Sequence, residues 1–303
     1  MWKIVQITIG IPSYNEEVSI RNLLEAIELQ DVNDQYKINE VIISDDSIDN
    51  TPEIVNDYAK KSRLDITLIH HNRRRGAAQA WNEIFSNAKS DAIILYDADI
   101  IPAKNATKLL ASNMKDDIAL CASNPLPLKQ SGIAARASSF NAYWLRRVRK
   151  RGLSQYTVMG RALSIRADVA KAITVPGIIA IDLYLQCKVL ELGYKVDYCD
   201  DAIVWFRPAS TMLDFASQVV RAVRGHEEIK DYVEKFDIKL PSSLILGETV
   251  REAFNDPQGM FATAIAYLAL PIYKAKVSKH TKSATWHVAN STKGISAHDL
   301  YDQ

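Results

Sequence analysis

Up to about Ala122, short apolar runs alternate with segments of helical pattern, and this alternation constrains the fold more than any other feature of the chain. The apolar runs, which are suited to strands buried on both faces, are Ile4–Ile11, Glu40–Ser44, Ile66–Ile69, Ala92–Tyr96 and Ile118–Ala122. The helical patterns between them are Val18–Leu29, Pro52–Lys61, Ala77–Asn87 and Ala103–Met114. Strand–helix alternation is typical of crossover units, so the sequence predicts an α/β fold with a Rossmann-like, mostly parallel central sheet flanked by helices.

The strict alternation ends after Ser123. The later elements that we predict are a helix at Ser131–Lys150, a strand at Ala162–Ile165, a helix at Asp182–Leu192, a strand at Lys195–Tyr198 and a helix at Leu213–Phe236. Gly193 is suited to the C-cap of the helix that precedes it. We expect one α/β domain over residues 1–236, with a first half at about 1–123 and a second half at about 124–236. A helical C-terminal extension follows at 237–303.

Charge and cysteine content exclude several classes of protein. The 37 Lys and Arg residues balance 36 Asp and Glu residues, so no overall field favours nucleic acid. Three scattered cysteines cannot form a disulfide framework, and they indicate a reducing compartment. No signal-peptide pattern opens the chain, so we expect a cytoplasmic protein.

Polar clusters follow four of the predicted strands. In an open α/β sheet, ligands bind beyond the carboxyl ends of the strands, so these clusters are the candidate site. They are Pro12–Glu17, Asp45–Ser47, Arg73–Gly76 and Asp97–Asp99. Carboxylates, a basic loop and a helix start at one sheet edge predict a site for a divalent cation and a phosphorylated ligand.

Asp97 and Asp99 are the candidate ligands of Mn²⁺ or Mg²⁺, because hard cations prefer carboxylate oxygens. The alternative is that one carboxylate caps the next helix and the other is solvated. Asp45 has two interpretations as well: it accepts a hydrogen bond from a nucleobase, or it braces its own loop. Arg75 and its basic neighbours are suited to phosphate oxygens, and a solvated basic loop is the alternative.

These motifs together resemble the family 2 glycosyltransferases of the GT-A fold, over about residues 4–225. The residues that carry the resemblance are Gly10–Glu17, Ile42–Thr51, Arg75-Gly76 with Ala80 and Asn82, and Tyr96–Asp99. The resemblance implies that Pro12, Tyr14, Glu16, Asp45 and Arg75 bind the nucleoside, and that Asp97 and Asp99 bind the metal and the diphosphate. It also favours UDP as the nucleotide.

Segments further along the chain extend the resemblance. Gly160 and Arg161 open a segment that resembles the acceptor-side strand of the family, and Asp182 matches its catalytic base. The family commonly has an acidic pair there, whereas this chain has Ile181 before Asp182. Helix capping is the alternative role of Asp182. An inverting transfer requires one carboxylate that takes the proton of the acceptor.

The remaining candidates are basic or polar residues that could contact the diphosphate or the acceptor. Gln218, Arg221 and Arg224 partly resemble an element of processive polysaccharide synthases, although the tryptophan that follows the arginine there is absent. A solvated helix face is an equal alternative for these three residues. Arg207, between Trp205 and Pro208, is a further candidate.

The tail contains an apolar stretch, Met260–Tyr273, followed by Lys274, Lys276, Lys279 and Lys282. It is too short to span a bilayer and contains Pro271. Such a segment lies in a membrane interface or packs against the domain or a second subunit. We therefore expect peripheral membrane contact through 258–282 or an oligomer, and the first option favours a lipid-linked acceptor.

The sequence thus predicts an inverting glycosyltransferase. The donor would be an NDP-sugar, and the acceptor would be a hydroxyl or phosphate group, on a lipid-linked molecule or a growing glycan. Two alternatives stay open: a nucleotide-sugar-binding protein without activity, and a sugar nucleotidyltransferase.

Overall fold

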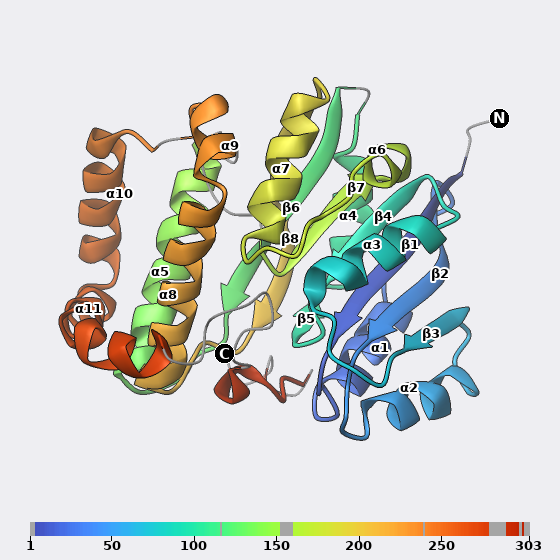
Figure 1. Ribbon diagram of the computed structural model, residues 1–303, viewed down its shortest axis with the longest axis horizontal. Coiled ribbons are helices and arrows are strands. Elements are labelled where there is room, and N and C mark those ends of the chain that lie inside the picture. Colours follow the sequence, from blue (N-terminus) through green and yellow to red (C-terminus); the bar gives the residue numbers. More distant parts are fainter. Residues whose placement is uncertain are drawn as a thin grey trace.

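The computed structural model describes residues 4–115, 117–151, 160–238, 240–278, 289–296 and 299, and it is built around one eight-stranded sheet (Figure 1). The strand order is β3–β2–β1–β4–β7–β6–β8–β5. The strands are β1 (Val5–Ser13), β2 (Tyr36–Asp45), β3 (Ile66–His70), β4 (Ala92–Tyr96), β5 (Ile100–Pro102), β6 (Ile118–Pro127), β7 (Ala162–Arg166) and β8 (Lys195–Phe206). Strands β3, β2, β1 and β4 pair in parallel, as do β6 and β8, whereas β7 and β5 run antiparallel to their neighbours.

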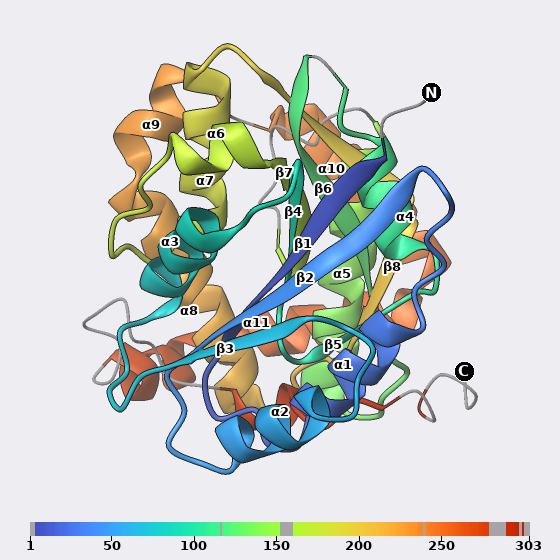
Figure 2. The same ribbon diagram turned by 90° about the vertical axis from the view of Figure 1, so that its right-hand side faces the viewer.

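Helices cover both faces of this sheet (Figure 2). On one face, α3 (Ala77–Asn87), α6 (Ala167–Lys171) and α7 (Ile181–Glu191) share a core with Ile93 and Leu95 of β4. On the other face, α1 (Ile20–Glu28), α2 (Thr51–Ala59) and α4 (Ala106–Ser112) pack with Ile94 and Tyr96. Successive residues of β4 thus point to opposite cores, which explains why this strand is apolar at every position.

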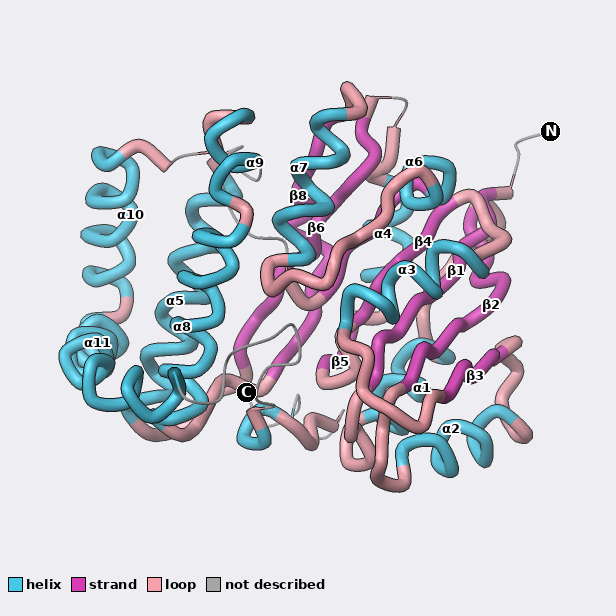
Figure 3. The backbone as a smooth tube through the Cα atoms, in the orientation of Figure 1, coloured by secondary structure: helices cyan, strands magenta, loops and turns pink. Residues whose placement is uncertain are grey.

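A group of helices stands beside the sheet, on the side of β6 and β8 (Figure 3). It consists of α5 (Ile133–Lys150), α8 (Met212–Glu228), α9 (Lys230–Lys235), α10 (Ser242–Asn255) and α11 (Pro257–Ser278), with a short 3₁₀ turn at Asn290–Thr292 further on. Helix α11 packs on both α5 and α8. No helix in the described part of the chain is long and apolar enough to cross a membrane.

The structure confirms the predicted α/β fold with a mostly parallel sheet, and it differs in detail. Strand β8 continues beyond the predicted end at Tyr198 as far as Phe206. The charged Asp200 is tolerated within the strand because its carboxylate accepts a hydrogen bond from Arg146 Nε at 2.8 Å. The short strand β5 and helix α6 were not predicted, whereas α10 and α11 lie in the predicted helical C-terminal extension. The last predicted helix divides at Ile229, whose side chain is buried against the start of α7. Gly193 has φ of 86°, as expected for the residue that ends α7.

Candidate active site

A cavity of about 670 Å³ opens at the carboxyl ends of β1 and β4. It is bounded by the start of α3, the start of α7, one face of α8 and the C-terminal segment Ala289–Lys293. Of the residues predicted from the sequence, those that line it are Pro12, Tyr14, Glu16, Asp97, Asp99, Gly160, Arg161, Asp182, Gln218 and Arg221. Residues as far apart in the sequence as Pro12 and Arg221 therefore converge on one site.

Asp97 and Asp99 form the acidic centre of the cavity. The Asp97 amide donates to the carbonyl of Arg161 at 2.8 Å, and Arg161 Nη1 lies 3.5 Å from Asp99 Oδ1. Arg161 adopts a left-handed backbone with φ of 70°, and its guanidinium lies 3.9 Å from the ring centre of Phe206. Burial and, next, the neighbouring charge of Asp99 raise the pKa of Asp97 to about 7, although the charge of Arg161 opposes the rise. The pair therefore favours a cation between or beside the two carboxylates.

Two carboxylates fit a divalent cation that completes its shell with phosphate oxygens and water, as Mg²⁺ usually does. In the described residues, no group of three or more His, Cys, Asp or Glu side chains converges to form a closed protein site. A metal at Asp97 and Asp99 would thus depend on a bound ligand for its other oxygens.

Asp182 lies in the first turn of α7 and faces the same cavity. It is not the N-cap, a position that Ala180 occupies, but its Oδ1 accepts from the Leu183 amide at 2.9 Å. Burial raises the pKa of Asp182, while the Leu183 amide and the charge of Arg221 oppose that rise. A carboxylate with a raised pKa is a stronger base.

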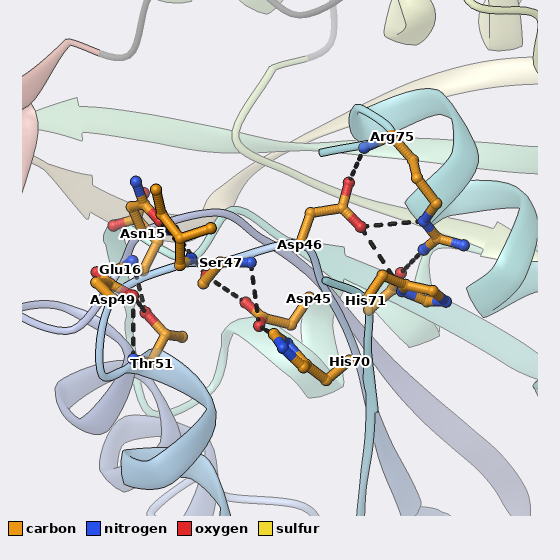
Figure 4. A network of polar contacts seen from close by, with 12 residues as sticks. Asn15, Glu16, Asp45, Asp46, Ser47, Asp49, Thr51, His70, His71 and Arg75 are labelled. Carbon is orange, nitrogen blue, oxygen red and sulfur yellow. Dashed lines mark hydrogen bonds and ion pairs between the residues drawn. The ribbon is translucent and has the colours of Figure 1, made fainter. Parts of the chain in front are cut away.

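Asp45 and Asp46 have different roles in the loop after β2 (Figure 4). Asp45 is fully buried, accepts from Ser47 Oγ at 2.5 Å and lies 2.7 Å from His70 Nδ1, so it braces the loop and does not line the cavity. Asp46 lines the cavity, and its Oδ2 accepts from the Gly76 amide at 3.0 Å. Asp45 therefore fits the alternative in which it braces its own loop, whereas the carboxylate of Asp46 lies where a ligand could reach it.

Arg74 and Arg75, in the basic loop after β3, also have different roles. The Arg75 guanidinium donates to Asp46 Oδ1 at 3.1 Å and to Glu83 Oε2 at 3.0 Å, so it ties the loop to α3 (Figure 4). Arg74 lines the cavity instead, with its guanidinium 4.1 Å from the ring centre of Tyr14. An arginine stacked on an aromatic ring at a cavity wall can contact a flat or anionic ligand.

The C-terminal segment Ala289–Ser296 returns across the sheet edge, and the sequence patterns did not reveal this. Thr292 Oγ1 donates to Asp99 Oδ2 at 3.2 Å, and Lys293 Nζ lies 2.9 Å from Glu16 Oε1. Burial and, next, the charge of Asp99 raise the pKa of Glu16 to about 8, although Lys293 opposes the rise. Buried Ile295 anchors the segment. The only signal in the sequence was a Thr-Lys-Gly triplet, Thr292–Gly294, outside any predicted element.

Besides Asp45 and Arg75, two further predicted residues, Arg207 and Arg224, do not line the cavity. Arg207 Nη2 donates to the carbonyl of Gly294 at 3.1 Å and to Asp299 at 3.2 Å, so it holds the returning segment. Arg224 is on α8 but does not line the cavity. Gln218 and Arg221 do line it, which favours the ligand-facing interpretation of that part of the helix.

Comparison with solved structures identifies the fold. A mannosyltransferase from Pyrobaculum calidifontis, in complex with GDP-Man and Mn²⁺, matches with a TM-score of 0.59 at 20% identity, covering 91% of this chain and 79% of the other. Residues 1–349 of TarS from S. aureus, in complex with UDP-GlcNAc, match with a TM-score of 0.52 at 17% identity, covering 89% and 83%. These two matches show the fold, which is similar to that of the GT-A glycosyltransferases.

Residues 8–173 match the family model described as glycosyl transferase family 2, and the chain belongs to this family. A probable glycosyltransferase, YdaM, from Bacillus subtilis (strain 168) is 26% identical over 251 residues, covering 76% of this chain and 57% of the relative. A poly-beta-1,6-N-acetyl-D-glucosamine synthase from Staphylococcus aureus (strain COL) is 26% identical over 232 residues, covering 74% and 55%. The chain therefore spans little more than half the length of these relatives. The resemblance noted in the sequence is confirmed.

Proposed function

We propose that this glycosyltransferase is an inverting enzyme. It transfers a sugar from an NDP-sugar, with UDP favoured, to a hydroxyl or phosphate group of a lipid-linked acceptor or a growing glycan. The observation that carries the proposal is the shared cavity of Asp97, Asp99 and Asp182. In this cavity Asp97 and Asp99 would serve the leaving group, and the separate carboxylate of Asp182 would serve the acceptor.

The donor half of the site would comprise Pro12, Tyr14, Glu16, Asp46 and Arg74, which line the cavity on the side of β1 and β2. Arg75 and Asp45 would support it from behind, through the loop contacts described above. The mannosyltransferase complex holds GDP-Man with Mn²⁺ and the TarS complex holds UDP-GlcNAc, and both support a nucleotide-sugar donor.

Asp97 and Asp99 would hold Mn²⁺ or Mg²⁺, which would offset the negative charge of the departing diphosphate. On the protein side, Arg161 and Lys293 add positive charge within this part of the cavity. Gln218 and Arg221 approach from α8 and would contact the diphosphate or the acceptor.

Asp182 would act as the base. Its carboxylate takes the proton of the acceptor O–H while that oxygen bonds to the anomeric carbon of the sugar. The bond from the anomeric carbon to the diphosphate oxygen breaks, and the nucleoside diphosphate keeps the electron pair. Gly160 also lines the cavity, with nothing within 4 Å of an added Cβ, and would leave room for the acceptor.

The proposal extends to the organisation and location of the protein. We assign catalysis to residues 1–236, with the nucleotide-binding half at about 1–123 and the acceptor half at about 124–236, assisted by the returning segment Ala289–Lys293. Acceptor presentation or assembly falls to the other part of 237–303. The free, buried thiols of Cys121, Cys187 and Cys199 fit a reducing compartment such as the cytoplasm. The synthase among the relatives supports a growing glycan as one acceptor class.

The test is turnover of UDP- and GDP-sugars in the presence of Mn²⁺, with the nucleoside diphosphate and pyrophosphate assayed separately. Asp182→Asn should reduce transfer by a factor of 100 or more, within the usual range for a general base, while nucleotide binding persists. Asp168→Asn, at a more exposed carboxylate on α6, is the matched control. Retained transfer in Asp182→Asn would reject the assigned base, and release of pyrophosphate would indicate a nucleotidyltransferase.

A further inference from the structure

Helix α11 is apolar on nearly all sides, although only one side is buried. Ala262, Ala266 and Val277 face the rest of the molecule, which α11 contacts through α5 and α8. On the outer side, Phe261 is 69% exposed and Leu268 is 81% exposed. An apolar helix is normally covered all round by protein or by lipid. The outer side of α11 therefore lacks a covering in the described part of the chain.

Helix α10, which contacts α11, also exposes apolar side chains. Leu246 is 67% exposed and Phe254 is 84% exposed, with Val250 between them at the spacing that aligns side chains on one helix face. We define the α10–α11 face as Leu246, Val250, Phe254, Phe261, Leu268 and Ile272, all of which are exposed. Isolated exposed apolar residues are ordinary, but a run of six along two consecutive helices marks an interaction surface.

The carboxylates of α10 are withdrawn from this surface. Glu248 and Glu252 are 2% and 4% exposed, and they pair inward with Arg151 at 2.9 Å and with Arg147. Cations remain on the outside: Lys274 and Lys276 are exposed on the last turns of α11, and Arg251, which pairs with Glu248, has a half-exposed side chain. The apolar face is thus bordered by positive charge.

An apolar pocket of about 420 Å³ lies beside Phe261, between the start of α5 and the start of α11. Its walls are largely the side chains of Ile133, Pro257, Ala262 and Ile265. Polar groups at its border are Arg136 Nη1 and Gln258 Oε1, which form a hydrogen bond of 2.7 Å. An apolar space with a cation at its border suits the chain and headgroup of an anionic amphiphile.

We propose that the α10–α11 face binds the surface of an anionic lipid bilayer. Exposed aromatic and aliphatic side chains enter the boundary between headgroups and acyl chains, and the neighbouring cations pair with anionic headgroups. A second copy of this chain fits less well, because it would bring the same border of positive charge against its own. Helix α8, on which α11 packs, also carries Gln218 and Arg221 into the cavity. The bilayer would thereby present a lipid-linked acceptor to the site, a consequence that rests on the proposed function.

Flotation of the full chain with vesicles tests the proposal without turnover, so its outcome is independent of the transferase assay. The vesicles are phosphatidylcholine alone, or phosphatidylcholine with one quarter phosphatidylglycerol. Each lysine near an anionic surface favours binding by about fivefold, so we expect at least tenfold stronger binding to the anionic vesicles. Lys274→Glu/Lys276→Glu should remove that preference.

The apolar contribution is tested by Phe254→Asp/Leu268→Asp, which should lower binding to anionic vesicles by tenfold or more. Both side chains are exposed, so the fold should persist, as checked by thermal unfolding. Leu29→Asp, at a residue 65% exposed at the end of α1, is the matched control and should bind as the wild type does. The proposal is overturned by a wild type that does not float, by equal loss in the Leu29 variant, or by a concentration-dependent dimer that Phe254→Asp/Leu268→Asp dissociates.

Discussion

Lys293 Nζ lies 2.9 Å from Glu16 Oε1, joining the last described part of the chain to the loop after the first strand. Both side chains are about one-tenth exposed, and the same ammonium group also donates to the backbone carbonyl of Asn15. A buried ammonium group held by these contacts fixes the position of a positive charge at the wall of the cavity. Lys293 therefore contributes a cation to a site whose other charges are mostly carboxylates.

Replacing this lysine should weaken nucleotide binding. In Lys293→Met, affinity for a nucleoside diphosphate should fall about tenfold or more, because a charge-assisted contact is worth about 1.5–3 kcal/mol. Titration calorimetry with UDP or GDP and Mn²⁺ measures the change. Lys274→Met, at an exposed lysine outside the cavity, is the control. Equal affinities in the wild type and Lys293→Met would exclude Lys293 from the ligand site.

The raised pKa of Glu16 predicts a dependence of stability on pH. Burial and Asp99 raise this pKa from 4.5 to about 8, so the protonated form is favoured in the folded protein. Its stabilising contribution is complete below about pH 4.5 and is lost as the pH rises through about 8.

Glu16→Gln stays neutral at every pH. Its Tm should match that of the wild type near pH 5 and exceed it by several degrees at pH 9, since each unit of pKa corresponds to about 1.4 kcal/mol. Scanning calorimetry from pH 5 to 9 without ligand tests this. A difference in Tm that stays constant over that range contradicts the raised pKa of Glu16.

Truncation of Arg75 should lower stability, whereas truncation of Arg74 should lower nucleotide affinity. Arg75→Ala removes the contacts to Asp46 and Glu83 and should lower the free energy of unfolding by about 2 kcal/mol, or roughly 4–8 °C in Tm. Arg74→Ala removes a cavity wall stacked on Tyr14 and should lower nucleotide affinity about fivefold with little change in Tm. Each variant serves as the control for the other, and the reverse pattern would exchange the two roles.

These adjacent pairs show what the sequence could and could not predict. The strands were predictable because their apolar runs reflect burial on both faces, and the strand ends located the site. The choice between Asp45 and Asp46, or between Arg74 and Arg75, depends on loop geometry that no period in the sequence encodes. Lys293 was missed for a different reason: its contact with Glu16 depends on how the chain returns after α11, which is a tertiary property.

The rise in Tm that Mn²⁺ causes should require Asp99. Without metal, Asp97 and Asp99 repel each other, so Mn²⁺ together with a nucleoside diphosphate should raise the Tm of the wild type by several degrees, and EDTA should reverse the rise. In Asp99→Ala the Mn²⁺-dependent part should disappear. Asp201→Ala, at an exposed carboxylate on β8, should respond as the wild type does. A Tm rise in Asp99→Ala as large as in the wild type would place the metal elsewhere.

Gly225 provides a test of how the base is positioned, because α8 approaches the residues before Asp182 at this glycine. A Cβ added there would lie 2.8 Å from Ala180 Cβ and 3.2 Å from Ala180 N, two residues before Asp182. Alanine would otherwise favour the helix by about 1 kcal/mol, so Gly225→Ala should change Tm little while moving the start of α7. We expect kcat to fall about tenfold or more with the KM for the donor nearly unchanged, since the donor side of the cavity is not touched. Gly247→Ala, on α10 with nothing within 4 Å of the added Cβ, is the matched control. A rise in the KM for the donor together with the fall in kcat would show instead that α8 positions the donor, through Gln218 and Arg221, rather than the base.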